Sequence, residues 1–151
     1  MSALKDRLEN DLSTAMKARD EVRTRTLRMV LTAVKNEEVA GRQARELSDD
    51  DVVKVLTREA KKRREAATAF ADAGRAEQAQ AERDENQVLE EYLPAQLGDV
   101  ELTALVADAI AESGAAGPRA MGQVMKIVNP KVAGRAEGGR VAAEVKKQLG
   151  A

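Results

Sequence analysis

The stretch Met121–Val141, MGQVMKIVNPKVAGRAEGGRV, decides the fold of the C-terminal part of the chain. Its first residues place apolar side chains at spacings of three and four, which is the pattern of one buried stripe on a helix. Pro130 has no backbone N–H and disfavours helical dihedral angles at the residue before it, so we expect the helix to end there. Residues 131–135 should then form a tight connector that turns at Gly134, and a second helix should follow.

The composition indicates an all-α protein. Ala, Glu, Lys, Leu and Arg, which all favour helices, make up more than half of the 151 residues, and only two residues are aromatic. The absence of cysteine and histidine removes disulfides, thiolate nucleophiles and imidazole bases, so we expect neither a metal site nor a cofactor. No apolar run is long enough to span a membrane, and the N-terminal residues carry no hydrophobic signal core. We therefore expect a cytoplasmic protein.

The N-terminal half should contain about four helices in two long antiparallel pairs. Ser2 can cap a first helix that has an apolar residue at every fourth position, and a second helix should cover residues 21–40. A third helix should begin after Ser48, where three aspartates follow, and should end near Ala73. Arg63 interrupts the apolar stripe of this helix, and we expect its long side chain to reach solvent.

A proline and a glycine mark the boundary between two parts of the chain. Pro94 and Gly98 lie close together, so we expect an N-terminal helical domain over residues 1–94 and a C-terminal three-helix module over residues 95–151. Asp99 is the expected cap of the first helix of that module.

The charge is divided unevenly along the sequence. Residues 1–99 carry 18 basic and 21 acidic side chains, whereas residues 119–151 carry seven basic and two acidic ones. The cationic tail favours an anionic partner. Because the chain has almost no aromatic residues on which single-stranded bases could stack, RNA binding would have to read the shape and the phosphates of a structured RNA.

Four stretches carry a family resemblance: TLRMVLTAVKNEE (residues 26–38), REAKKRREAATAF (residues 58–70), LEEYLPAQL (residues 89–97) and the stretch Met121–Val141 quoted above. Together they resemble the YqeY-like family over essentially the full length. The resemblance implies a two-part all-α protein whose C-terminal module is shared with the tail of the B subunit of the glutamyl/aspartyl-tRNA amidotransferase. There the module helps to hold tRNA, and the chemistry lies in other domains and subunits. Glu137 departs from the family pattern, which usually has Asp, a better helix cap.

The glycines and cations of the C-terminal module are the candidate nucleic-acid-binding residues. Glycine lets a ligand approach the backbone closely, and amides at the start of a helix attract phosphate. The alternative is a solvated cationic rim without a ligand, and we expect the charged groups of Arg135 and Arg140 to lie in solvent. The candidates are Gly122, Lys126, Lys131, Gly134, Arg135, Gly138 and Arg140.

A second basic cluster lies on the third expected helix. Lys54, Arg58, Lys61 and Lys62 could form one basic side, but neighbouring glutamates favour a solvated face. The carboxylate runs at residues 49–51 and 90–91 are explained better by helix capping and solvation than by metal binding or acid–base chemistry, because no nucleophile accompanies them.

These observations favour a non-catalytic auxiliary factor that binds tRNA through its C-terminal module. One alternative is a helical adaptor whose partner is a tRNA synthetase or an amidotransferase. A third alternative, a carbon–nitrogen ligase with glutamine as amido donor, follows from the family association only, because the sequence shows no recognisable catalytic residues.

Overall fold

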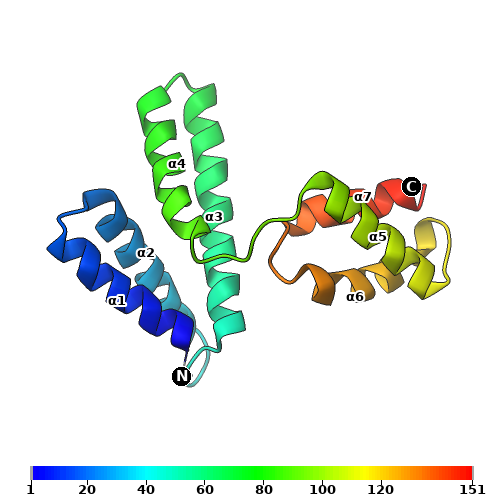
Figure 1. Ribbon diagram of the computed structural model, residues 1–151, viewed down its shortest axis with the longest axis horizontal. Helices are drawn as coiled ribbons and strands as arrows, with labels where there is room; N and C mark the ends of the chain where they lie inside the picture. The colour runs from blue at the N-terminus through cyan, green and yellow to red at the C-terminus, as the bar shows by residue number, and fades with distance from the viewer. Residues whose placement is uncertain (1, 151) are drawn as a thin grey trace. The chain divides into compact units, whose positions relative to one another are not determined.

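The computed structural model describes residues 2–150, and within this range every regular element is a helix (Figure 1). No strand occurs in the described chain, which confirms the all-α class. Within residues 2–150, none of the helices is long and apolar enough to cross a membrane. The elements are α1 (Ala3–Lys17), α2 (Glu21–Glu38), α3 (Asp49–Asp72), α4 (Ala76–Glu90), α5 (Asp99–Ser113), the 3-10 turn η1 (Pro118–Ala120), α6 (Met121–Val132) and α7 (Gly138–Gln148).

The backbone divides into two compact units. The N-terminal unit extends to Leu93 and contains α1 to α4, and the C-terminal unit begins at Pro94 and contains α5 to α7. Each unit has its own cluster of buried apolar side chains, and no residue belongs to both clusters. Each unit therefore has the core that an independently stable structure requires.

Side-chain caps fix where three helices of the N-terminal unit begin. Ser2, Asp20 and Ser48 each accept a hydrogen bond from an amide in the first turn of the following helix, and Ser48 forms a reciprocal capping box with Asp51. A cap satisfies an amide that has no acceptor inside the helix and contributes roughly 1 kcal/mol. The predicted caps Ser2 and Ser48 are confirmed, whereas α2 ends at Glu38, two residues earlier than expected.

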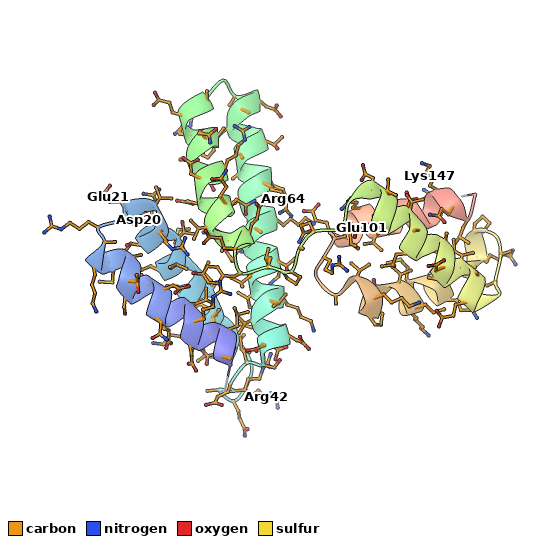
Figure 2. All side chains as sticks on the ribbon, viewed as in Figure 1. Asp20, Glu21, Arg42, Arg64, Glu101 and Lys147 are labelled. Atoms are coloured by element: carbon orange, nitrogen blue, oxygen red, sulfur yellow. The ribbon has the colours of Figure 1, made fainter. Side chains whose placement is uncertain are left out.

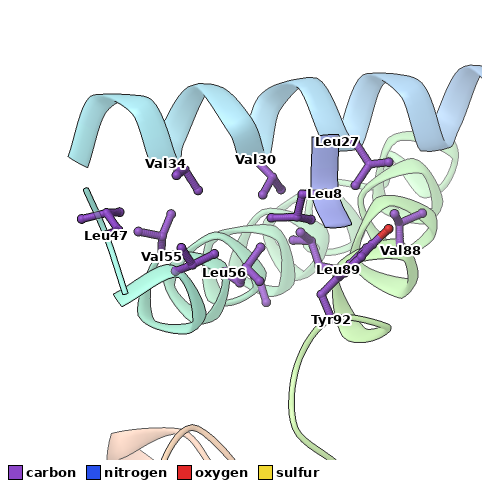
Figure 3. Packing of buried hydrophobic residues seen from close by; sticks show 12 residues of the cluster. Leu8, Leu27, Val30, Val34, Leu47, Val55, Leu56, Val88, Leu89 and Tyr92 are labelled. Carbon is purple, nitrogen blue, oxygen red and sulfur yellow. The ribbon is translucent and has the colours of Figure 1, made fainter. Parts of the chain in front are cut away.

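The core of the N-terminal unit receives side chains from all four helices (Figure 3). α1 packs on α2 and α3 packs on α4, and α2 also contacts both helices of the second pair. Burying a Val or Leu side chain contributes roughly 1.5–3 kcal/mol, so this cluster is the main source of stability for the unit. Its buried members include Leu8, Leu27, Val30, Val34, Leu47, Val55, Leu56, Val88, Leu89 and Tyr92.

Tyr92 closes this core just beyond the end of α4. Its hydroxyl donates to the carboxylate of Asp11 on α1 and accepts from the guanidinium of Arg23 on α2 at 3.2 Å. The guanidinium of Arg7 lies 4.6 Å from the centroid of the ring. Burial and the hydrogen bond to Asp11 raise the pKa of Tyr92 to about 12. The tyrosine thus ties the end of the second helix pair to the first pair.

Arg63 lies in the core, so the prediction that its side chain reaches solvent is wrong. The side chain is only 4% exposed, and its Nε lies 3.4 Å from a carboxylate oxygen of Glu85 on α4, which is 10% exposed. Its Nη1 donates to Glu59 one turn earlier on α3, and Glu85 also accepts from Arg25 of α2 at 2.8 Å. A buried charge is tolerated here because carboxylates on its own helix and on a neighbouring helix face it.

The core of the C-terminal unit lies among α5, α6 and α7. It is built mainly from valines, and all three helices contribute. Leu105 and Ile110 lie at its edge and are only partly buried. The main buried side chains are Leu102, Val106, Val124, Val128, Val141 and Val145.

α6 continues through Pro130 to Val132, so the predicted end of this helix is wrong. The proline cannot donate to the carbonyl of Lys126, but the next turn is again hydrogen-bonded, since the Ala133 amide donates to the carbonyl four residues earlier at 3.0 Å. Val128 and Val132, on the two sides of the proline, are buried. Their burial outweighs the loss of one hydrogen bond in the last turn.

Candidate nucleic-acid interface

Gly122 and Lys126 lie one turn apart on the exposed side of α6. A Cβ added at Gly122 would meet no atom within 4 Å, so internal packing does not require a glycine there. Glycine inside a helix costs about 0.5–1 kcal/mol relative to alanine. Lys126 has no carboxylate within 4 Å in the described part of the chain. On this surface, the backbone at Gly122 is not covered by a side chain, and the ammonium group of Lys126 is free to pair with an external anion.

The start of α7 is a second surface where glycine leaves the backbone uncovered. Gly138 and Gly139 form its first two positions, both are exposed, and a Cβ on either would meet nothing within 4 Å. Glu137 occupies the cap position without a capping hydrogen bond from its side chain. The first-turn amides therefore keep the capacity to bind an anion.

Gly134 serves the turn between α6 and α7. Ala133 and Gly134 have φ values of +39° and +81°, which reverse the chain after α6. The predicted pivot at Gly134 is confirmed, and its φ value explains why glycine is favoured there. The side chain of Gln96 donates to the carbonyl of Gly134 at 3.2 Å. This glycine thus has a structural reason that is independent of any ligand.

Lys131 extends from the last turn of α6 toward α5. Its Nζ lies 2.7 Å from a carboxylate oxygen of Glu112, and both side chains are largely exposed. An exposed ion pair contributes at most about 1 kcal/mol and weakens with salt. A phosphate could therefore replace Glu112 as the partner of this lysine at little cost.

Arg135 and Arg140 bind the segment 95–99 that leads into α5. Their side chains are 39% and 34% exposed, so the predicted exposure of their charged groups holds only in part. Arg135 donates from Nε to the carbonyl of Ala95 at 3.1 Å, and its own carbonyl accepts from the amide of Leu97 at 2.7 Å. Arg140 donates from Nη1 to the carbonyl of Leu97 at 2.7 Å. The two guanidinium groups supply donors to backbone carbonyls that have no helix to satisfy them.

Two carboxylates of α5 complete these contacts. Nη2 of Arg140 lies 2.8 Å from Asp99, and Nη2 of Arg135 lies 3.6 Å from Glu101, which Figure 2 labels on α5. Asp99 is the first residue of α5 and makes no capping hydrogen bond, since Gly98 occupies the cap position. The predicted capping role of Asp99 is therefore wrong, and its carboxylate faces Arg140 instead.

These pairs change the charge of the candidate interface. Residues 94–150 contain seven basic and six acidic side chains, and acids of α5 pair with Lys131, Arg135 and Arg140. Much of the positive charge of the C-terminal unit is therefore balanced within the unit.

Lys146 and Lys147 are two further candidate residues that the sequence analysis did not select. Both are exposed on α7 and have no ion pair in the described chain (Figure 2 labels Lys147). They lie off the buried stripe of α7, which is a signal that could have identified them.

Residues 2–150 bring together no group of three or more acidic, cysteine or histidine side chains that could hold a metal ion. The titratable groups of the C-terminal unit are arranged as ion pairs and solvated charges. The arrangement can bind an anion by charge and by exposed amides.

We expect Arg140→Gln to lower the free energy of unfolding of the C-terminal unit by about 1.5 kcal/mol. The substitution removes the charged donor from the Leu97 carbonyl and the partner from Asp99, and hydrogen bonds to charged groups contribute roughly 1.5–3 kcal/mol. Hydrogen exchange of α5 and α7 amides measures the change. Arg119→Gln, at an exposed site without a described ion pair, is the control. Equal exchange in the two variants would contradict the bracing role of Arg140.

The sequence profile of one protein family, described as Yqey-like protein, matches residues 5–149, which is nearly the whole chain. Among curated proteins, none matches the chain.

Proposed function

Since this chain belongs to the YqeY-like family, we propose that it is a non-catalytic cytoplasmic factor whose C-terminal unit binds tRNA through the phosphates and the shape of the folded RNA. One observation carries the proposal: helical glycines that packing does not require lie on the exposed side of the same helices that carry unpaired lysines. The resemblance of Met121–Val141 to the tail of a tRNA-dependent amidotransferase subunit supports tRNA as the RNA.

The proposed contacts fall into two groups with different roles. Gly122, Lys126, Gly138 and the lysines of α7 offer close approach and free charge to the phosphates. The connector that holds α7 in place is maintained by Gly134, Arg135 and Arg140. Lys131 can exchange its carboxylate partner for a phosphate. The first group contacts the phosphates directly, and the second group holds α7 in the position from which it makes these contacts.

We expect the variant Lys126→Gln, Lys146→Gln, Lys147→Gln to bind tRNA more weakly and with a smaller dependence on salt. Each lost phosphate contact removes the release of about one counterion, so the slope of log affinity against log salt should fall by roughly two to three for the triple variant. A titration of tRNA at several salt concentrations measures both quantities. Lys17→Gln, Lys35→Gln, Lys54→Gln, which changes exposed lysines of the N-terminal unit, is the matched control.

Gly122→Ala tests the bare backbone separately from charge. The added methyl group meets nothing inside the protein, so the variant should be as stable as the parent or more stable by about 0.5–1 kcal/mol. Its tRNA affinity should nevertheless fall, because the methyl group blocks close approach of the RNA backbone.

Two outcomes would contradict the proposed interface. Equal losses of tRNA affinity for the two triple lysine variants would indicate diffuse electrostatic attraction instead of specific contacts. No binding of tRNA by the parent protein at low salt would reject the proposal and favour the adaptor.

A further inference from the structure

The segment that connects the two units is itself bound to the C-terminal unit. Residues 95–98, which we call the joint segment, lie between α4 and α5 and have no regular secondary structure (Figure 1). The amide of Leu97 donates to the carbonyl of Arg135 at 2.7 Å, and Nε of Arg135 donates to the carbonyl of Ala95 at 3.1 Å. The side chain of Leu97 is only 4% exposed and belongs to the core among α5, α6 and α7. The joint segment is therefore held by its backbone and by an apolar side chain.

Two further side chains strengthen this attachment. Gln96 donates from its side-chain nitrogen to the carbonyl of Gly134 at 3.2 Å. Arg140, in the first turn of α7, donates to the carbonyl of Leu97 at 2.7 Å. Gly134, Arg135 and Arg140 are the residues that position α7 for the proposed phosphate contacts. The same set of hydrogen bonds thus holds both the joint segment and the proposed RNA-binding surface.

These bonds determine how much unanchored chain separates the two units. On the N-terminal side, Tyr92 is buried in the core, and Leu93 packs against that core. When the joint segment is attached, the unanchored stretch shrinks to Pro94, whose ring fixes its own φ and restricts the residue before it. When the joint segment is detached, the unanchored stretch extends over residues 94–98. Since an extended residue spans about 3.5 Å, detachment lengthens the tether by up to roughly 14 Å.

We propose that RNA binding to the C-terminal unit and attachment of the joint segment are coupled, so that bound RNA keeps the tether between the two units short. The inference rests on the proposed function. RNA binds the attached form better, because in that form Arg135 and Arg140 hold the start of α7 in place. A ligand that prefers one form of an equilibrium shifts the population toward that form, and the coupling is reciprocal. Detachment of the joint segment accordingly weakens RNA binding.

The amide of Leu97 provides the measurement. Its hydrogen exchange in the full-length protein reports how often the joint segment detaches, because its bond to the Arg135 carbonyl lies outside any helix. Exchange is followed by NMR with and without tRNA. At a tRNA concentration ten times the dissociation constant, a ligand that binds only the attached form slows this exchange about tenfold. The shift of the Lys126 amide signal shows independently that tRNA is bound.

Two other amides serve as controls. The amide of Tyr92 donates to the carbonyl of Leu89 at 3.0 Å in the N-terminal unit. The amide of Gly114 donates to the carbonyl of Ala111 at 3.3 Å, at the other end of α5. Neither bond involves the turn between α6 and α7, so the exchange of both amides should be the same with and without tRNA.

Gln96→Ala tests the attachment itself. Gln96 is exposed and is not one of the proposed phosphate contacts. The substitution removes the bond to the Gly134 carbonyl, so exchange of the Leu97 amide without RNA should become about fivefold faster, the factor for one ordinary hydrogen bond. Addition of tRNA should still slow it. Gln123→Ala, at an exposed position of α6, should leave the exchange unchanged.

Four results would overturn the proposal, and they separate it from the proposed function. If the Lys126 signal shifts with tRNA while the exchange of Leu97 stays the same, RNA binds but the coupling is absent. Faster exchange with tRNA would mean that phosphates take the arginines from the backbone carbonyls, which is the opposite coupling. Equal slowing of Leu97 and Gly114 would indicate uniform stabilisation of the unit. If the Lys126 signal does not shift, the proposed function fails, and the coupling fails with it.

Discussion

Glu85→Leu should lower the free energy of unfolding of the N-terminal unit by about 3 kcal/mol. The substitution leaves the guanidinium of Arg63 in the core with Glu59 as its remaining carboxylate partner and the sulfur of Met29 as a weak acceptor, and removal of one member of a buried ion pair costs roughly 3–5 kcal/mol. The lower end applies because Glu59 remains within 3.3 Å of Arg63. Urea unfolding followed by circular dichroism measures the loss.

The double variant Arg63→Met, Glu85→Leu distinguishes an uncompensated charge from a lost contact. Replacing both charges by apolar side chains of similar size removes the buried charge, so most of the lost stability should return. Gln87→Leu, at an exposed position of the same helix, controls for the added leucine. If the double variant were less stable than Glu85→Leu, the pair would be a net source of stability, and our account of its cost would be wrong.

Leu102→Ala should destabilise the C-terminal unit by about 3 kcal/mol. Leu102 is 3% exposed in the core among α5, α6 and α7, and replacing a buried leucine by alanine costs roughly 2–5 kcal/mol. Leu105→Ala, one turn later on the same helix, should cost about 1 kcal/mol, because that side chain is only partly buried at the edge of the core.

Hydrogen exchange resolves where the stability is lost. Amides of α5, α6 and α7 should exchange faster in Leu102→Ala, whereas amides of α1 to α4 should be unaffected, because the two units share no core residue. A larger effect for Leu105→Ala than for Leu102→Ala would contradict the observed burial.

The helices could be predicted because their signals are local. Apolar residues at helical spacing and caps such as Ser2 and Ser48 act within one or two turns, and these predictions are confirmed. The predicted end of α6 at Pro130 is wrong because a proline near the end of a helix costs only one hydrogen bond. Whether the helix continues depends on the burial of the residues on both sides of the proline, and that burial is decided by packing against another helix. The position of Arg63 depends on Glu85, which is remote in sequence and carries no local signal.

The candidate interface could be predicted only in part for a similar reason. The exposure of Gly122 and Lys126 follows directly from the buried stripe of α6. The contacts of Arg135 and Arg140 could not be foreseen, because they go to backbone carbonyls. Every residue carries a carbonyl, so the side-chain sequence does not distinguish the ones that will lack a partner after folding.

Tyr92 also determines what optical methods can observe in this protein. The chain has one tyrosine, one phenylalanine and no tryptophan, so nearly all of its near-ultraviolet absorption and intrinsic fluorescence comes from this ring. The ring is 5% exposed and lies against Arg7, with its hydroxyl bound to Asp11 and Arg23. Its signal reports the packing of α1, α2 and the end of α4. The C-terminal unit contains no chromophore of this kind in residues 94–150, so an engineered aromatic residue or a labelled RNA would be needed to follow it by light.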